Sequence, residues 1–147
     1  MREAGDRSLA SYLAGYQGMV RADDAAEAAA WLASAVETAP RSLSGAASSW
    51  LSALYAEAAA RIGDRRAALA SLDQATKALS GPRSGHREAW MYEFDQGSLA
   101  MRTGFCLVAL GQSAEALTAF DNALGLLPAG RERRYAEFRW GWLPLTS

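Results

Sequence analysis

The side chains that most often carry catalysis are few in this chain and lie far apart. The single histidine, His86, lies in a stretch rich in glycine and serine, with no cysteine or second histidine nearby to share a metal ion. The single cysteine, Cys106, has no sequence-adjacent base, and its place inside a predicted helix indicates a small buried packing residue. The acidic residues, for example Glu57, Glu93 and Asp95, are scattered and do not single out a catalytic pair. We therefore expect no enzyme activity, no metal site and no cofactor.

The composition predicts that the secondary structure around these residues consists of helices alone. Half of the residues are hydrophobic, and alanine, the strongest helix former, is unusually common. Valine and isoleucine, which favour strands, are scarce. The helix-breaking prolines are widely spaced, at positions 40, 82, 128 and 144. The chain is therefore predicted to be all-α.

Charge and hydropathy exclude several classes of partner. The formal net charge of −1 provides no basic field for nucleic acid or an anionic membrane surface. The arginines of segment 131–139 are interrupted by glutamates, which is typical of a solvated helix face. The first residues lack the apolar core of a signal peptide, and no apolar run approaches the roughly 18 residues that span a bilayer. Together with the lone cysteine, these features predict a cytoplasmic protein with no membrane or nucleic-acid contact.

Two segments of the chain share one pattern. Residues 59–75 and 107–123 each place a predicted helix before a glycine-polar turn, then Ala-Leu, a large apolar residue, Asp and Ala at identical spacing. The turn glycines, Gly63 and Gly111, are 48 residues apart, which is the 34 residues of one repeat plus an insertion of 14. The chain is thus predicted to be built from repeated helix pairs.

These segments resemble the tetratricopeptide repeat, whose signature places small residues and a large one around two helices and closes with proline. The third copy, 97–130, carries signature residues at Gly104, Gly111, Ala116, Phe120, Ala123 and Pro128. The second copy, 49–82, carries them at Ala56, Gly63, Ala68, Leu72 and Ala75, with a slightly late Pro82. A weaker first copy, 9–42, carries Asp23, Ala28, Leu32, Ala35 and Pro40. There Tyr16 stands where a small residue is expected, unless a longer turn gives that role to Gly15.

The resemblance implies one domain, 1–147, folded as a right-handed α-solenoid of three helix pairs with a C-terminal capping helix. In the second helix of each pair, a small, a large and a small residue recur at i, i+4 and i+7, so neighbouring helices can nest against that face. Helices are expected at about 7–21, 24–38, 45–62, 64–79, 86–110, 112–126 and 130–140. The helix at 86–110 includes an extension, 86–96, before the third repeat, and the cap segment is 130–142.

A closer resemblance lies in the run Trp90-x-Tyr92-x-Phe94-Asp95 that leads into the final repeat. It looks like the C-terminal tetratricopeptide region of bacterial helix-turn-helix transcriptional regulators of the XRE type. In that family the repeats sense a peptide, a small molecule or a partner, and mediate dimerisation. Because residue 1 lies close to the first repeat, we expect no DNA-binding domain in this chain, whether it is an excised regulatory domain or a free-standing relative.

The resemblance also implies a binding groove, because the first helix of each tetratricopeptide pair lines the concave face. The positions that carry over to this groove are Gln17, Arg21, Trp50, Glu57, Arg61, Met101, Arg102 and Phe105, with Leu13, Ala53 and Ser98 beside them. Arginines that grip carboxylates beside aromatics that bury side chains suit an extended peptide. The alternative is that Trp50, Met101 and Phe105 pack between repeats. Leu13, Ala53 and Met101 stand where chaperone-binding relatives carry lysine, so a chaperone cofactor is not expected.

Two functions remain open at this point. The leading hypothesis is a protein- or peptide-interaction module, the ligand- or partner-sensing part of a bacterial transcriptional regulator. The alternative is a homodimerising scaffold element without a ligand of its own. It rests on the tryptophans at 31, 50, 90, 140 and 142, because some of them must lie near the surface of so small a stack.

Overall fold

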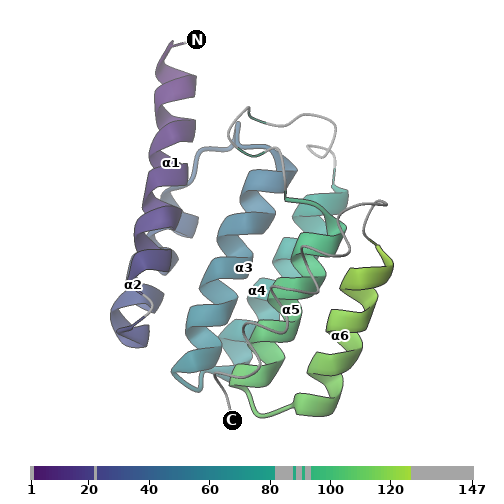
Figure 1. Ribbon diagram of the computed structural model, residues 1–147. Coiled ribbons are helices and arrows are strands. Elements are labelled where there is room, and N and C mark those ends of the chain that lie inside the picture. Colours follow the sequence, from purple (N-terminus) through teal and green to yellow (C-terminus); the bar gives the residue numbers. More distant parts are fainter. Residues whose placement is uncertain (1, 22, 82–87, 89–90, 92–93, 127–147) are drawn as a thin grey trace.

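The computed structural model describes residues 2–21, 23–81, 88, 91 and 94–126. This part of the chain folds into six helices and contains no strand, which confirms the all-α prediction (Figure 1). The helices are α1 (Arg2–Val20), α2 (Ala25–Thr38), α3 (Gly45–Arg61), α4 (Arg65–Ser80), α5 (Gln96–Ala109) and α6 (Ser113–Gly125). No helix within the described residues is both long and apolar enough to cross a membrane. The expected capping helix at 130–142 lies outside the described residues.

Short polar side chains begin most of these helices. At each of four helix starts, a side-chain oxygen accepts a hydrogen bond from the backbone N–H three residues later, which satisfies a donor that the helix leaves unpaired. The capping residues are Asp24, Ser44, Asp64 and Asp95. Helix α6 begins after Gln112, which makes no such bond.

The two glycine turns, at Gly63 and Gly111, have the same backbone structure. Gly63 and Gly111 both adopt φ +81°, a conformation that favours glycine. After each glycine, the next residue donates its backbone N–H to a carbonyl five residues earlier: Asp64 to Ala59 at 2.9 Å and Gln112 to Leu107 at 2.8 Å. This bond closes a helix C-terminus in the Schellman arrangement. The chain therefore reverses direction between α3 and α4 in the same way as between α5 and α6.

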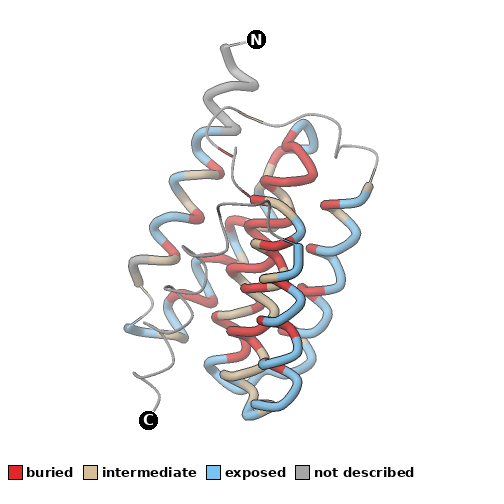
Figure 2. Tube along the Cα trace, turned by 45° about the vertical axis from the view of Figure 1, so that its right-hand side comes forward, coloured by how far each residue is buried: buried red, intermediate tan, exposed pale blue. Residues whose placement is uncertain are grey.

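Helix α3 forms the centre of the structure and packs against α2, α4 and α5. Figure 1 shows it between the α1–α2 pair on one side and α5–α6 on the other, and Figure 2 shows the buried residues concentrated along the central helices. Its alanines at 46, 47, 53, 56, 58, 59 and 60 are all buried. The predicted small–large–small faces of α2, α4 and α6 are buried as well. Small side chains let α3 be covered on several sides at once.

The start of α5 differs from the prediction. The helix begins at Gln96 and not near residue 86, and none of the described residues at 88, 91, 94 and 95 is α-helical. Asp95 is extended (φ −132°, ψ −170°) and caps the new helix through the N–H of Ser98, 2.9 Å away. Gly97 therefore lies in the first turn of α5 and does not bend a longer helix.

The described residues before Asp95 make contacts with α3 and with the core. The Glu88 carboxylate accepts hydrogen bonds from the backbone N–H of Ser44, at 2.9 Å, and from the Ser44 hydroxyl. A carboxylate at this position compensates the positive end of α3. Met91 and Phe94 are buried in the same core cluster as Trp50. Glu88 is thus held by the N-terminus of α3, and Met91 and Phe94 are held by the core.

The α5–α6 pair allows a test of the predicted tight packing. A Cβ added to Gly104 would lie 2.3–2.7 Å from the ring of Phe120, which is fully buried and has little room to move. We expect Gly104→Ala to lower the free energy of unfolding by about 1–2 kcal/mol, because overpacking outweighs the better helix propensity of alanine. The matched control is Gly125→Ala in α6, where the added Cβ meets no atom within 4 Å. Urea denaturation of both variants measures the difference, and equal stabilities would contradict the predicted close approach.

Candidate functional site

A pocket of about 240 Å³ lies where the α1–α2 pair meets α3 and α5. Its lining consists of Gly18 and Met19 from α1, Ala25, Ala28 and Leu32 from α2, Leu54, Glu57, Ala58 and Arg61 from α3, and Arg102 from α5. Most of these side chains are apolar, and the three charged ones lie together. The pocket therefore combines an apolar lining with one charged cluster.

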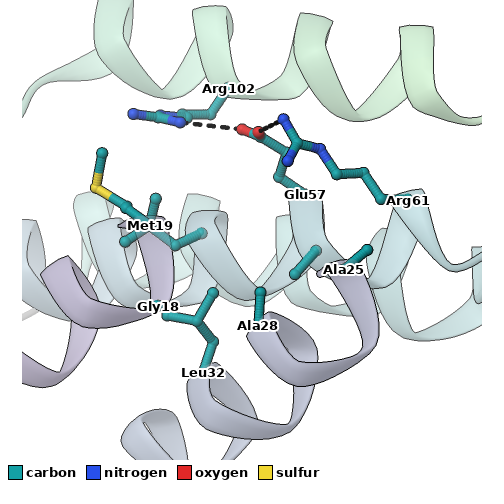
Figure 3. A pocket seen from close by; sticks show the side chains of 10 residues that line it. Gly18, Met19, Ala25, Ala28, Leu32, Glu57, Arg61 and Arg102 are labelled. Carbon is teal, nitrogen blue, oxygen red and sulfur yellow. Dashed lines mark hydrogen bonds and ion pairs between the residues drawn. The ribbon is translucent and has the colours of Figure 1, made fainter. Parts of the chain in front are cut away.

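Glu57 holds both arginines of this pocket. One of its carboxylate oxygens lies 3.1 Å from Nη2 of Arg61, one helical turn further along α3. The other lies 3.0 Å from Nη1 of Arg102 on α5. Figure 3 shows the two guanidinium groups reaching this carboxylate from opposite sides. The Glu57 side chain is only 15% exposed, so this cluster is screened by water less than a surface ion pair is.

The charged residues of the two central helices all belong to this cluster. Helix α3 contains no charged residue other than Glu57 and Arg61, and α5 contains none other than Arg102. The charged residues of the pocket lining are thus two arginines and one glutamate. A guanidinium carries five N–H donors, and the ion pair with Glu57 engages Nη1 of Arg102. The arrangement suits an anionic group placed beside an apolar one.

The apolar part of the pocket comes from close helix contacts. A Cβ at Gly18 would lie 2.5 Å from the side chain of Leu32, so the glycine lets α1 approach α2. Leu32, Leu54 and Ala58 are buried, and Met19 is partly buried against the same cluster. The repeat pattern did not identify Met19 or the α2 residues, because it assigns only certain first-helix positions to a groove. The sequence contains one signal for this part of the pocket: small residues stand at 18, 25 and 28, near the end of α1 and the start of α2.

The structure brings together three of the eight predicted groove residues: Glu57, Arg61 and Arg102. Arg21 makes other contacts: its Nε lies 3.1 Å from Glu27, and its guanidinium lies 4.5 Å above the ring of Trp31. Gln17 is exposed and its backbone carbonyl accepts a hydrogen bond from Arg21. Neither Arg21 nor Gln17 lines the pocket.

The three large apolar groove residues pack between helices. Trp50 stacks on Tyr12 of α1, with ring centroids 5.6 Å apart, and Phe105 meets Phe120 edge to face at 5.5 Å. Met101 lies in the same buried cluster as Phe105. This burial is the arrangement described by the alternative interpretation. The rings contribute to the core and do not line the pocket.

Cys106, on α5, is fully buried, as expected from the sequence. Burial raises the pKa of its thiol to about 12, the nearby charge of Glu57 adds to this effect, and Arg102 and Arg61 oppose it. The protonated thiol is a poor nucleophile, since the thiolate is the reactive form. Among the residues that the structure describes, no group of three or more His, Cys, Asp and Glu side chains is placed to hold a metal ion.

Comparison of the chain with protein-family models, with characterised proteins and with solved structures gave no match.

The burial of Cys106 predicts how stability depends on pH. The pKa of about 12 in the folded chain exceeds the ordinary value of 9.0, so between these values the unfolded chain binds fewer protons than the folded one. Below pH 9.0 the thiol therefore does not reduce the free energy of unfolding. As pH rises above this value, the free energy of unfolding falls by up to about 1.4 kcal/mol per pH unit. Urea denaturation at a series of alkaline pH values measures this slope. Cys106→Ala should make the slope shallower, and a thiol that reacts with a disulfide reagent equally fast in the native and unfolded chains would contradict the prediction.

Proposed function

We propose that this chain is a protein-interaction module that binds a peptide segment of another protein, with the pocket as the anchoring site. The observation that carries the proposal is the placement of all three charged residues of α3 and α5 beside an apolar pocket. Charges on central helices are costly to desolvate, so their gathering at one accessible place favours recognition of a charged ligand. This is a proposal for binding without catalysis.

The size of the pocket supports a peptide anchor. Pockets that enclose drug-sized ligands typically measure about 300–1,000 Å³, and this one measures about 240 Å³. It suits one or two side chains of a longer ligand. The lining by Leu32, Leu54 and Met19 favours an aliphatic or aromatic side chain.

The charge of the cluster supports an acidic group in the bound segment. The ion pair with Glu57 engages Arg102 at Nη1, and a carboxylate of the ligand would accept hydrogen bonds from other N–H donors of this guanidinium. Charge-assisted hydrogen bonds to guanidinium groups are about twice as strong as neutral ones. The proposed ligand is thus a peptide segment with an acidic group next to a large apolar residue.

The more specific proposal, that the module is the sensing part of a bacterial transcriptional regulator folded as a tetratricopeptide solenoid, rests on the sequence resemblance. The two equivalent turns at Gly63 and Gly111 and the buried small–large–small faces are consistent with repeated helix pairs. The peptide-binding proposal does not depend on this regulatory role.

Peptide selection followed by binding measurements tests the proposal. A displayed library of random peptides is selected on the folded wild type, and the affinity of an enriched peptide is measured by fluorescence anisotropy. We expect Arg102→Gln to weaken binding at least about tenfold, because a charge-assisted hydrogen bond contributes about 1.5–3 kcal/mol. The matched control is Arg66→Gln on α4, an exposed arginine that does not line the pocket, which should leave the affinity unchanged.

A second pair of variants tests the apolar part of the pocket. Ala25→Leu should fill the pocket and weaken binding of the same peptide, because the side chain of residue 25 lines it. Ala30→Leu makes the same change at an exposed position of α2 outside the pocket and should have no effect. Equal affinity for the wild type, Arg102→Gln and Ala25→Leu would overturn the site assignment. Failure to enrich any peptide would count against peptide binding itself.

A further inference from the structure

The Glu57 carboxylate lies between the two arginines of the pocket (Figure 3). One of its oxygens lies 3.1 Å from Nη2 of Arg61 and the other lies 3.0 Å from Nη1 of Arg102, so this one acidic group joins α3 to α5. An anionic ligand that approaches these guanidinium groups therefore meets a carboxylate of the chain that is already bound to them.

The position of this negative charge is fixed. Arg61 follows Glu57 by four residues on α3, an order and spacing that favour an ion pair, and Arg102 holds the carboxylate from the neighbouring helix. The Glu57 side chain is 15% exposed, whereas those of Arg61 and Arg102 are 35% and 24% exposed. The carboxylate thus cannot turn away from a second anion without breaking an ion pair.

The charge of Glu57 acts on its surroundings even though both arginines contact it. Burial is the largest cause of the raised pKa of the Cys106 thiol, and the negative charge of Glu57 is the second. Arg102 and Arg61 lower the same pKa, each by less than Glu57 raises it. A ligand anion beside the cluster would experience this negative charge as well.

We infer that Glu57 makes the pocket select a carboxylate over a phosphorylated side chain as the acidic group of the bound peptide. The inference rests on the peptide-binding function proposed above. Guanidinium groups match both carboxylate and phosphate, so arginines alone do not separate the two. A carboxylate brings one negative charge next to Glu57, whereas a phosphorylated serine brings about −1.5 to −2 at pH 7. Selection against the phosphate thus comes from a repulsive group in the site.

Coulomb's law gives the size of the effect. For two groups about 6 Å apart, each extra unit of charge changes the affinity by between roughly threefold and a hundredfold, for effective dielectric constants of about 80 and 20. Glu57 is largely but not fully buried. We therefore expect a factor of about ten between phosphoserine and glutamate.

Three forms of one peptide test the inference. The peptide selected on the wild type is synthesised with glutamate, phosphoserine or glutamine at its acidic position, and fluorescence anisotropy measures each affinity at about pH 7.5, where phosphoserine is mostly dianionic. The wild type should bind the glutamate form at least as tightly as the phosphoserine form, and the glutamine form most weakly. Glu57→Gln should shift the ratio of the first two affinities about tenfold toward phosphoserine, because the repulsion is removed.

Two further variants are the controls. Glu57→Asp keeps the negative charge and should keep the wild-type ratio, even where both affinities fall. Asp73→Asn removes a carboxylate that is 64% exposed, pairs with Lys77 on α4 and does not line the pocket, and it should also keep the ratio. A loss of folded protein lowers both apparent affinities by the same factor, so it leaves the ratio unchanged.

The outcomes separate this inference from the proposed function. A wild type that binds the phosphoserine form at least about tenfold more tightly than the glutamate form would overturn the inference, and this result needs no variant. A Glu57→Gln chain with the wild-type ratio would overturn it as well. Peptide binding itself would stand in both cases. A wild type that binds the glutamine form as tightly as the glutamate form would instead overturn the proposed recognition of an acidic group, and the inference with it.

Discussion

The close packing of α3 against helices on several sides is the constraint on which the rest of the structure depends. A helix that contacts α2, α4 and α5 has little room for long side chains, and α3 accordingly buries alanine and serine along much of its length. The same constraint applies to the neighbouring helices. Glycine at position 15 leaves room for the ring of Trp50, and glycine at position 104 leaves room for the ring of Phe120. Interiors packed in this way tolerate small changes of volume poorly. The rings of Trp50 and Phe120 therefore each have a glycine opposite them, and neither helix pair can come closer without a clash.

This constraint also explains the position of the candidate site. A charged side chain on α3 or α5 must reach water, and the described helices leave an accessible pocket where α1 and α2 meet α3 and α5. Glu57, Arg61 and Arg102 converge there, and their mutual ion pairs compensate part of the cost of leaving bulk water. The burial of Cys106 keeps its thiol protonated. This region thus combines an ion-pair cluster with an apolar lining.

Local signals in the sequence predicted much of the helix pattern. The ends of α2, α3, α4 and α6 lie within one or two residues of the prediction, because caps such as Asp64 and turn glycines such as Gly63 act through adjacent residues. The predicted start of α5 was wrong. The prediction gave more weight to the helical spacing of the apolar residues before Asp95 than to Asp95 itself as a helix cap. Glu88 contacts Ser44 at the N-terminus of α3, and local spacing does not reveal a contact across 44 residues.

The candidate site was predictable only in part, for a related reason. Repeat positions placed Glu57, Arg61 and Arg102 on one face, and the structure brings these side chains into ion-pair contact. Their role in binding stays a prediction. The same positions also selected Trp50 and Phe105, which are buried by Tyr12 and Phe120 from neighbouring helices. A repeat position fixes the direction of a side chain but not what covers it.

Helix α1 contributes both to the core and to the proposed binding site. Its residues Gly18 and Met19 line the pocket, and its Tyr12 stacks on Trp50 of α3. Gly15 and Gly18 let this helix approach Trp50 and Leu32 closely. Because α1 and α2 line one side of the pocket and α3 and α5 the other, a ligand bound there would contact both sides. By linkage, such a ligand would stabilise the packed position of α1, and a substitution that displaces α1 would weaken binding.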